Sequence, residues 1–465
     1  MSTYQKASLD IKSVFSLIKR SLSGATLDYT TGSIRNAIFL LAIPMILEMC
    51  MESVFAVVDI FFVGRIGKDA VATVGLTESV LTLVYSAAIG LSMASTALVA
   101  RRIGEKEPGE AARAGAQGIL ITIGLTVIIT ICGLIFAPHI LGLMGAPQEV
   151  IITGSSYTRI MFGGCIVIML LYLINGIFRG AGNASIAMWS LWIANGCNII
   201  LCPILIHFYG LKGAAIATTI GRGTGVCYQL FHLFKGSGII RLIRSYFIPD
   251  WNIIRNISNI AWSGTLQFLI GSASWIFMAR IVASFGSGPI AGYQIAIRIM
   301  LFFLLPAWGM SNAASTLVGQ NLGAKQPDRA ERSVWVTAGY NTIFMAFVSV
   351  LLFFASEPIV RFMIKDAGVE DVATLALRIV SLGYVFFGIG MVMTNAFNGA
   401  GDTRTPTIVN FFCFWTFQIP IAYLMAIYWN LGPKGVFLAI VITETLVTLV
   451  SILLFRRGGW KKIKI

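Results

Sequence analysis

Charged residues are scarce in this sequence. Asp, Glu, Lys and Arg together make up only 12% of the 465 residues, whereas 57% are hydrophobic. A soluble globular domain carries about 25% charged residues, so the composition excludes that class. Apolar stretches of the roughly 20 residues needed to cross a bilayer recur along the chain. We therefore predict an all-α polytopic membrane protein.

Catalytic signatures are missing as well. The chain has 3 histidines, and none of them forms an HExxH zinc motif. We find no GxxxxGK[ST] phosphate loop and no GxSxG nucleophile elbow. We therefore expect neither an enzyme nor an ATP-driven pump, and no bound cofactor. The 7 cysteines form no CxxC pair and lie in apolar segments, which indicates reduced residues of the protein core.

The apolar stretches number twelve, and an even number places both termini on one side of the membrane. We expect the spans near 37–62, 71–99, 114–137, 154–177, 186–207, 213–234, 257–284, 290–318, 334–356, 375–397, 406–429 and 435–455. The formal net charge is +14. When Lys and Arg are assigned to alternating sides, most fall on the side of the termini, as the positive-inside rule requires. The basic charge therefore faces anionic lipid headgroups and the cytoplasm rather than nucleic acid.

An internal repeat divides the chain into halves. The 22 residues from Gly90 (GLSMASTALVARRIGEKEPGEA) align with those from Gly309 (GMSNAASTLVGQNLGAKQPDRA), 219 positions later, with nine of the 22 identical. Because each half holds an even number of spans, both copies enter the membrane in the same sense. The sequence predicts two pseudo-symmetric six-helix bundles related by an axis along the membrane normal, a parallel repeat typical of transporters.

We assign five regions on this basis. Residues 1–36 are a cytoplasmic N-terminal segment, 37–234 the N-terminal bundle, 235–256 a cytoplasmic linker, 257–455 the C-terminal bundle and 456–465 a basic cytoplasmic tail.

Three acids occupy one face of the first span. At about 100° per residue, Glu52 and Asp59 lie within 40° of Glu48 around the helix. A charged side chain at the bilayer centre costs roughly 2.5–3.5 kcal/mol or more, so this face should border the bundle interior or a wet cavity. Pro44, one turn before the first acid, favours a bend in the helix. The equivalent positions of the second half hold no acid (Gln267, Gly271 and Met278), which indicates a specific task for the N-terminal bundle.

Several strings in order resemble those of one transporter family. They are LAIPMILEMCMESVFAVVDIFFVGRIGKDAVATVGL in the first span, NGIFRGAGN, NIILCP and YGLKGAAIAT in the first half, and GYQIAIRI, LVGQNLGAKQ, NAFNGAGDTRTP and GPKGVFLAI in the second. Over its whole length the chain resembles the multidrug and toxic compound extrusion (MATE) family. The resemblance implies an antiporter of the prokaryotic inner membrane that exports amphipathic, often cationic compounds against inward H⁺ or Na⁺.

The resemblance also implies an ion-coupling site. Asp59 matches the family's aspartate on the first span, and Pro44 matches the proline where that helix bends. Asn175, Asn198 and Thr218 match polar positions of the fourth, fifth and sixth spans. In the family an aspartate follows four residues after the asparagine of the fifth span, but here that position is Cys202, whose thiol is a poor Na⁺ ligand.

Two explanations of this departure stay open. Either Glu52 replaces the missing carboxylate, or the protein is driven by protons, which we favour slightly. In the first case Na⁺ would bind at Asp59, Asn198 and Thr218. The accessory positions are Glu48, Cys202, Arg222 and Glu444, which line the cavity or pack within a bundle. Arg222 and Glu444 lie at equivalent positions of the halves, either paired with each other or satisfied separately.

A lipid-linked oligosaccharide flippase is the alternative function, since that class has a similar pair of bundles. It would need several arginines in the cleft for pyrophosphate, whereas we expect only Arg159, Arg222, Arg280, Arg298 and Arg378 within spans. We expect the small-molecule antiporter, acting as a monomer.

Overall fold

Helices account for all the regular structure in the part of the chain that the computed structural model describes, which is residues 11–24, 28–236, 238–364 and 366–465. The first bundle contains α2 (Ile34–Gly64), α3 (Lys68–Gly104), α4 (Pro108–Leu143), α5 (Gln148–Gly163), α6 (Cys165–Gly180), α7 (Ala184–Tyr209) and α8 (Leu211–Lys235). The second contains α9 (Trp251–Ala283), α10 (Ser287–Gly323), α11 (Pro327–Met363), α12 (Ala367–Ser381), α13 (Tyr384–Ala400), α14 (Arg404–Asn410), the π-helices η2 (Phe411–Gln418) and η3 (Leu424–Tyr428) around α15 (Ile419–Tyr423), and α16 (Pro433–Arg456). Short helices α1 (Ile11–Leu22), η1 (Arg244–Phe247) and η4 (Gly459–Lys462) lie outside the bundles.

The helices have the length and composition of membrane spans. Among the described residues, 10 helices are long and apolar enough to cross a bilayer, and α12 with α13 makes an eleventh span that is bent by 57°. The remaining predicted span is α8, which packs along α7 but is less apolar. The predicted all-helical polytopic fold is therefore confirmed. Residues 1–10 and 25–27 of the predicted N-terminal segment and residue 237 of the predicted linker lie outside the described residues.

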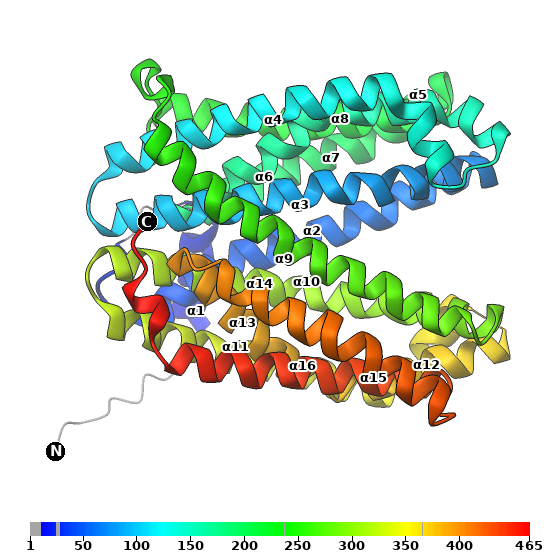
Figure 1. The fold of residues 1–465 in the computed structure, drawn as a ribbon. Helices are drawn as coiled ribbons and strands as arrows, with labels where there is room; N and C mark the ends of the chain where they lie inside the picture. Colours follow the sequence, from blue (N-terminus) through cyan, green and yellow to red (C-terminus); the bar gives the residue numbers. More distant parts are fainter. Residues whose placement is uncertain (1–10, 25–27, 237, 365) are drawn as a thin grey trace.

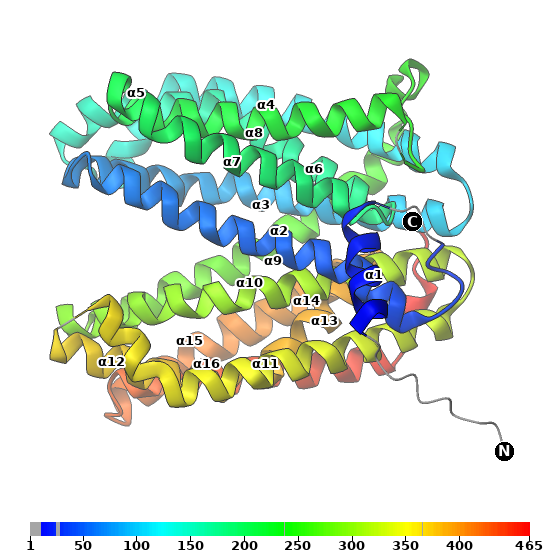
Figure 2. The same cartoon turned by 180° about the vertical axis from the view of Figure 1, so that it is seen from behind.

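The two groups of helices lie side by side along a common direction. Figure 1 shows α2–α8, coloured blue to green, above α10–α16, coloured yellow-green to red, with α9 running obliquely from the first group to the second, and the reverse view in Figure 2 shows the same separation. Each group has its own buried apolar core, one centred on α3, α4 and α6 and the other on α10, α11 and α16. The two pseudo-symmetric bundles expected from the repeat are thus present.

The bundles touch through their first two helices. The first helix of each bundle packs on the second helix of the other, so that α2 contacts α10 and α3 contacts α9. Gly90 and Gly309 mark these crossings, because a Cβ on Gly90 would overlap the Ala261 carbonyl oxygen and a Cβ on Gly309 would overlap that of Met45. The glycines that begin the repeated sequence therefore serve close approach of backbone to backbone.

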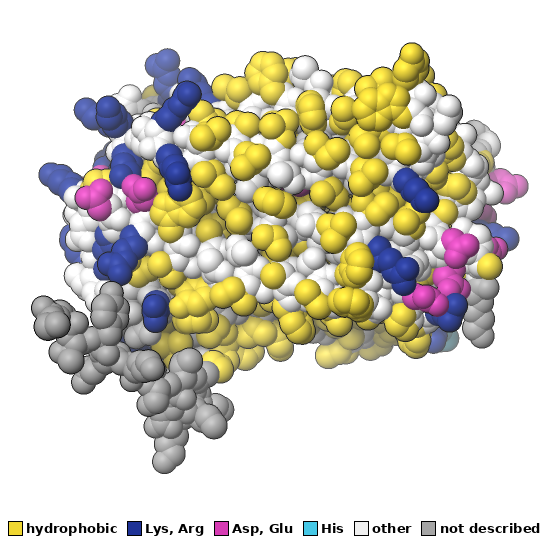
Figure 3. All heavy atoms as spheres, turned by 90° about the horizontal axis from the view of Figure 1, so that it is seen from below, with side chains coloured by type: hydrophobic (Ala, Val, Ile, Leu, Met, Phe, Trp, Pro, Cys, Tyr) yellow, Lys and Arg dark blue, Asp and Glu magenta, His cyan; other side chains and the backbone are white. Residues whose placement is uncertain are grey.

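The surface agrees with a membrane environment. Figure 3 shows hydrophobic side chains across the middle of the visible face and charged side chains toward its two ends. Lys and Arg gather at the end that carries α1 and the C-terminus. Apolar side chains such as Ile128 and Phe354 are 62% and 75% exposed, as expected of a surface that faces lipid.

Candidate functional site

A cavity of about 670 Å³ lies between the bundles. In the C-terminal parts of α3 and α10, residues 92–104 and 311–323 are almost entirely buried. The earlier parts of both helices have many exposed positions, which indicates that the cavity begins where the close packing ends. We call the packed end, which also carries α1 and the C-terminus, the closed end.

The two walls of the cavity differ in chemistry. The first bundle contributes mainly polar groups: Glu52, Ser79, Thr82, Tyr85, Ser92, Thr96, Tyr172 and Arg179. The second bundle contributes mainly aromatic and aliphatic groups, including Phe268, Trp275, Met300, Leu304 and Trp308, beside the polar Ser272, Asn312, Ser315 and Asn395. Phe268 and Trp308 stack with ring centroids 6.2 Å apart. A molecule with one polar or charged end and one aromatic end matches both walls.

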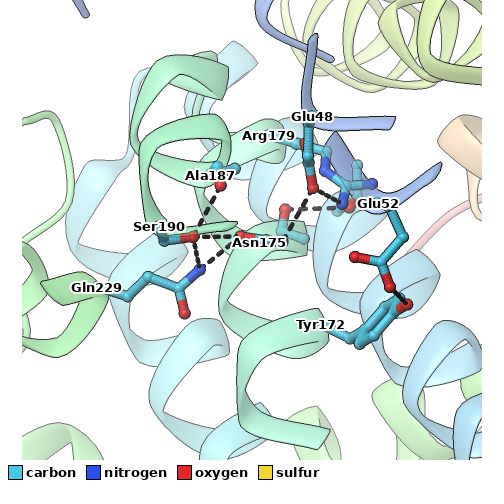
Figure 4. Close-up of polar contacts among 10 residues, drawn as sticks. Glu48, Glu52, Tyr172, Asn175, Arg179, Ala187, Ser190 and Gln229 are labelled. Atoms are coloured by element: carbon cyan, nitrogen blue, oxygen red, sulfur yellow. Dashed lines mark hydrogen bonds and ion pairs between the residues drawn. The ribbon is translucent and has the colours of Figure 1, made fainter. Parts of the chain in front are cut away.

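Glu48 is the centre of a polar network inside the first bundle, behind the polar wall of the cavity (Figure 4). Arg179 Nη2 and Asn175 Nδ2 both donate to Glu48 Oε1, at 2.7 and 2.9 Å. Gln229 Nε2 and Ser190 Oγ donate in turn to Asn175 Oδ1, at 2.5 and 3.2 Å. The network joins α2, α6, α7 and α8. Because the Glu48 side chain is only 1% exposed, its pairing with Arg179 satisfies two charges that would otherwise be costly in the membrane.

Glu52 forms a second ion pair, one turn further along α2. Arg222 Nη2 on α8 lies 3.2 Å from Glu52 Oε1, and the Tyr172 hydroxyl donates to the same oxygen at 3.5 Å. Arg222 is 3% exposed and Glu52 is 22% exposed, because Glu52 also reaches the cavity. Glu52 therefore sits between the buried guanidinium and the space where substrate would bind.

Asp59 is buried, at 7% exposure, and its Oδ1 has no hydrogen-bond partner. It interacts electrostatically with Arg222, with Glu78 on α3 and with Cys202 on α7. Within the described residues it makes no hydrogen bond to the amides expected around it. Asn198 Nδ2 donates instead to Thr218 Oγ1 at 3.1 Å, which leaves Asn198 Oδ1 buried and unpaired.

The structure thus regroups the predicted residues. Asn175 contacts Glu48, and Arg222 pairs with Glu52 rather than with Glu444, so the idea of a direct Arg222–Glu444 pair is wrong. None of the accessory positions Glu48, Cys202, Arg222 and Glu444 is among the described residues that line the cavity. Pro44 lies inside a continuous α2 and is buried.

Two site residues escaped prediction. Arg179 was placed after the fourth span, but α6 continues to Gly180, so its side chain reaches both Glu48 and the cavity. The five arginines expected within spans were therefore an incomplete set. Glu78 was overlooked although it lies within the predicted span 71–99, because its interaction with Asp59 on α2 is visible only in three dimensions.

Two pseudo-symmetric helical bundles around a central cavity, closed at one end, define a class of membrane transporters. A family model described as MatE matches residues 44–204 and 265–424, which is more than half of the chain. The chain therefore belongs to the MATE family, whose members are transporters and not enzymes, and the resemblance seen in the sequence is confirmed.

Individual relatives agree over nearly the whole length. "Probable multidrug resistance protein NorM" of Thermotoga maritima is 25% identical over 92% of this chain and 94% of its own. "Multidrug export protein MepA" of Staphylococcus aureus is 22% identical over 89% and 91%. A solved structure described as the outward-facing conformation of a multidrug resistance MATE family transporter superposes with a TM-score of 0.89 at 25% identity, covering 94% of this chain and 99% of that one.

Proposed function

We propose that this protein exports amphipathic, cationic small molecules from the cytoplasm in exchange for an inward-moving cation. The observation that carries the proposal is the cavity between the bundles, where the Glu52 carboxylate on one wall faces Trp275 and Trp308 on the other. A carboxylate attracts a cationic group, while aromatic rings bind apolar surface and organic cations. The relatives named for multidrug resistance or export support the same substrate class.

Sidedness follows from charge. Lys and Arg gather at the closed end, and the positive-inside rule assigns such an end to the cytoplasm. Both termini would then be cytoplasmic, and the cavity would open outward. In the cycle that we propose, the cation arrives from outside and neutralises Asp59. The change of charge alters the packing of α2 around Pro44, and substrate leaves toward the outside.

The proton is the favoured driving ion. Na⁺ requires oxygen ligands, and Asp59 and Asn198 each offer an unpaired buried oxygen. However, the Arg222 guanidinium interacts with Asp59 and the Cys202 thiol stands where an oxygen ligand would help. A fixed positive charge opposes the uptake of either cation at Asp59, but a proton needs only one carboxylate oxygen and no cage of ligands.

Transport in proteoliposomes tests the proposal. A pH gradient, acidic outside, should drive the release of tetraphenylphosphonium loaded inside the vesicles, and a Na⁺ gradient imposed separately should have little effect. Asp59→Asn should abolish this coupled movement while the protein stays folded. Asp69→Asn removes an exposed acid at the start of α3 and should leave transport intact. Full pH-driven transport by Asp59→Asn would refute the coupling assignment.

The flippase alternative gains no support from the cavity. A pyrophosphate headgroup requires several cationic partners, yet Arg179 is the sole arginine among the described residues that line the cavity.

A further inference from the structure

Arg222 is deeply buried but uses only part of its hydrogen-bonding capacity. Its Nη2 contacts Glu52, whereas Nε and Nη1 have no partner. A guanidinium offers five N–H donors in a planar fork, and buried donors without partners are costly. An arginine held only for structure would be expected to bond on both sides.

Asp59 is an acceptor that could serve the unpaired donors of Arg222. Asp59 Oδ1 is buried and unpaired, and Asp59 interacts electrostatically with Arg222. Glu52 and Asp59 stand seven residues apart on one face of α2, which is roughly 10 Å along the helix axis. Phe55 lies between them in sequence, and the Arg222 guanidinium carbon is 5.1 Å from the centre of the Phe55 ring. Unpaired donors and an unpaired acceptor thus flank the same turn of α2.

Aromatic rings hold the guanidinium between the two acids. Besides Phe55, the Tyr85 ring centre lies 5.9 Å from the Arg222 guanidinium carbon. Cation–π attraction at a desolvated site is worth about 2 kcal/mol. The charged and titratable groups that face Arg222 or Asp59 are Glu52, Glu78, Tyr85, Tyr157, Tyr172 and Cys202. Among the described residues the other cation that acts on this set is Arg179, near Tyr172, and it is paired with Glu48, so Glu52 and Asp59 compete for Arg222.

We infer that Arg222 is a counter-ion shared by Glu52 and Asp59, and that this sharing links the driving cation to substrate release. When Asp59 is neutralised, Arg222 pairs with Glu52, and the Glu52 carboxylate has no net charge to offer the cavity. When Asp59 is ionised and has no cation bound, its carboxylate pairs with Arg222, and the Glu52 carboxylate becomes free to bind a cationic substrate. Driving cation and substrate then exclude each other although they bind different acids. This inference rests on the proposed function, because it requires a cationic substrate in the cavity.

Equilibrium binding of tetraphenylphosphonium to the purified full-length protein tests the inference without any gradient. Asp59 does not line the cavity, so Asp59→Asn should matter only through Arg222. At alkaline pH we expect Asp59→Asn to weaken binding at least fivefold, because the guanidinium then stays on Glu52. In the Arg222→Gln background the same change should alter the affinity less than twofold. Arg222→Lys, which keeps the charge, should restore at least part of the Asp59→Asn effect.

Two results would overturn the inference. One is an equal loss of affinity on Asp59→Asn with and without Arg222, and the other is no loss in the native background. If Arg222→Gln does not fold, Glu52→Gln serves instead: Asp59→Asn must then have less than a twofold effect, and a fivefold effect would contradict sharing. Binding is measured without transport, so the two proposals can fail separately. If the variants show the expected binding affinities but a pH gradient drives no movement of the probe, antiport is refuted and the sharing of Arg222 is not.

Discussion

Gly104 and Gly323, 219 residues apart in the two repeats, lie against each other's helix where α3 crosses α10. A Cβ on Gly104 would overlap the Gln320 carbonyl oxygen, and a Cβ on Gly323 would overlap the Arg101 carbonyl oxygen. Arg101 and Gln320 are themselves 219 residues apart. The two backbones therefore touch around the pseudo-two-fold axis, and a side chain on either glycine would separate them.

Arg101 and Gln320 also bind the opposite bundle with their side chains. Arg101 Nη2 donates to the Ala400 carbonyl oxygen at 3.3 Å, and Gln320 Nε2 donates to that of Gly180 at 2.9 Å. Both acceptors lie in the Gly-Ala-Gly turns of the repeat. The closed end is thus a symmetric seal, in which the glycines and the Gly-Ala-Gly turns are identical in both repeats while Arg101 and Gln320 differ.

Replacing Gly323 by alanine should open this seal. Overpacking of a tight contact costs about 1–3 kcal/mol, and here the obstacle is backbone that cannot rotate away. We expect at least a tenfold loss of drug efflux and faster labelling of a cysteine placed at Ser315, assayed in a background without the native cysteines. Gly339→Ala on α11 is the control, because a Cβ there meets nothing within 4 Å. Equal efflux by both variants would contradict a seal at Gly323.

The sequence was sufficient for the fold because each step used a strong signal. The apolar runs predicted the spans, and the spacing between Gly90 and Gly309 predicted the parallel repeat. What the repeat could not predict is irregularity within one half, such as the 57° bend between α12 and α13. The π-helical turns before and after α15 were also missed, since Pro420 removes one backbone donor but does not say how the helix will compensate.

The site was predicted only in part. Helical periodicity correctly placed Glu48, Glu52 and Asp59 on one helix, and burial of Glu48 and Asp59 follows from it. Each acid pairs with a cation from another helix. The position and rotation of that helix cannot be predicted from the periodicity of α2. Arg179 and Arg222 come from α6 and α8, so their partners became visible only in three dimensions.

Breaking the Glu48–Arg179 pair should destabilise the protein more than removing both charges. Glu48→Gln leaves the Arg179 guanidinium without its counter-ion inside the membrane, which costs about 3–5 kcal/mol for a buried pair. The double variant Glu48→Gln with Arg179→Gln should recover more than half of that loss. Unfolding free energies from denaturant titration in micelles measure the difference. Additive losses would show that the two side chains act independently.

The aromatic wall should control which substrates bind. Trp275→Ala removes ring surface from the cavity, and we expect aromatic cations to bind five- to tenfold more weakly, while small aliphatic ammonium ions change less than twofold. Trp262→Ala on the same helix is the control, because that side chain is 66% exposed outside the cavity. Fluorescence titration with ethidium measures the affinities. A matching loss in the Trp262 variant would indicate a general effect on α9.

Residues 28–32, which we call the strap, precede α2 and should connect both bundles at the closed end. Asp28 Oδ2 accepts from Lys106 of the first bundle at 2.6 Å, while Arg329 of the second bundle donates to the carbonyl oxygens of Thr31 and Gly32 at 2.8 and 3.0 Å. Burial alone would raise the pKa of Asp28, but hydrogen bonds from Lys106 and Thr30 outweigh it and lower the pKa. A carboxyl with a lowered pKa stabilises the folded state above its unfolded pKa and loses that contribution as pH falls through the folded one.

Hydrogen exchange of residues 28–32 tests this strap. Because the Asp28–Lys106 pair is largely exposed, its contribution should stay below about 1 kcal/mol, and exchange at neutral pH should quicken up to fivefold in Asp28→Asn. In the unmodified protein the same acceleration, after correction for intrinsic rates, should appear only when the pH falls below the unfolded pKa of about 3.9. Glu107→Gln changes a neighbouring exposed acid that makes no capping bond and should leave exchange unaltered. An onset of faster exchange near neutral pH would assign the strap to a group other than Asp28.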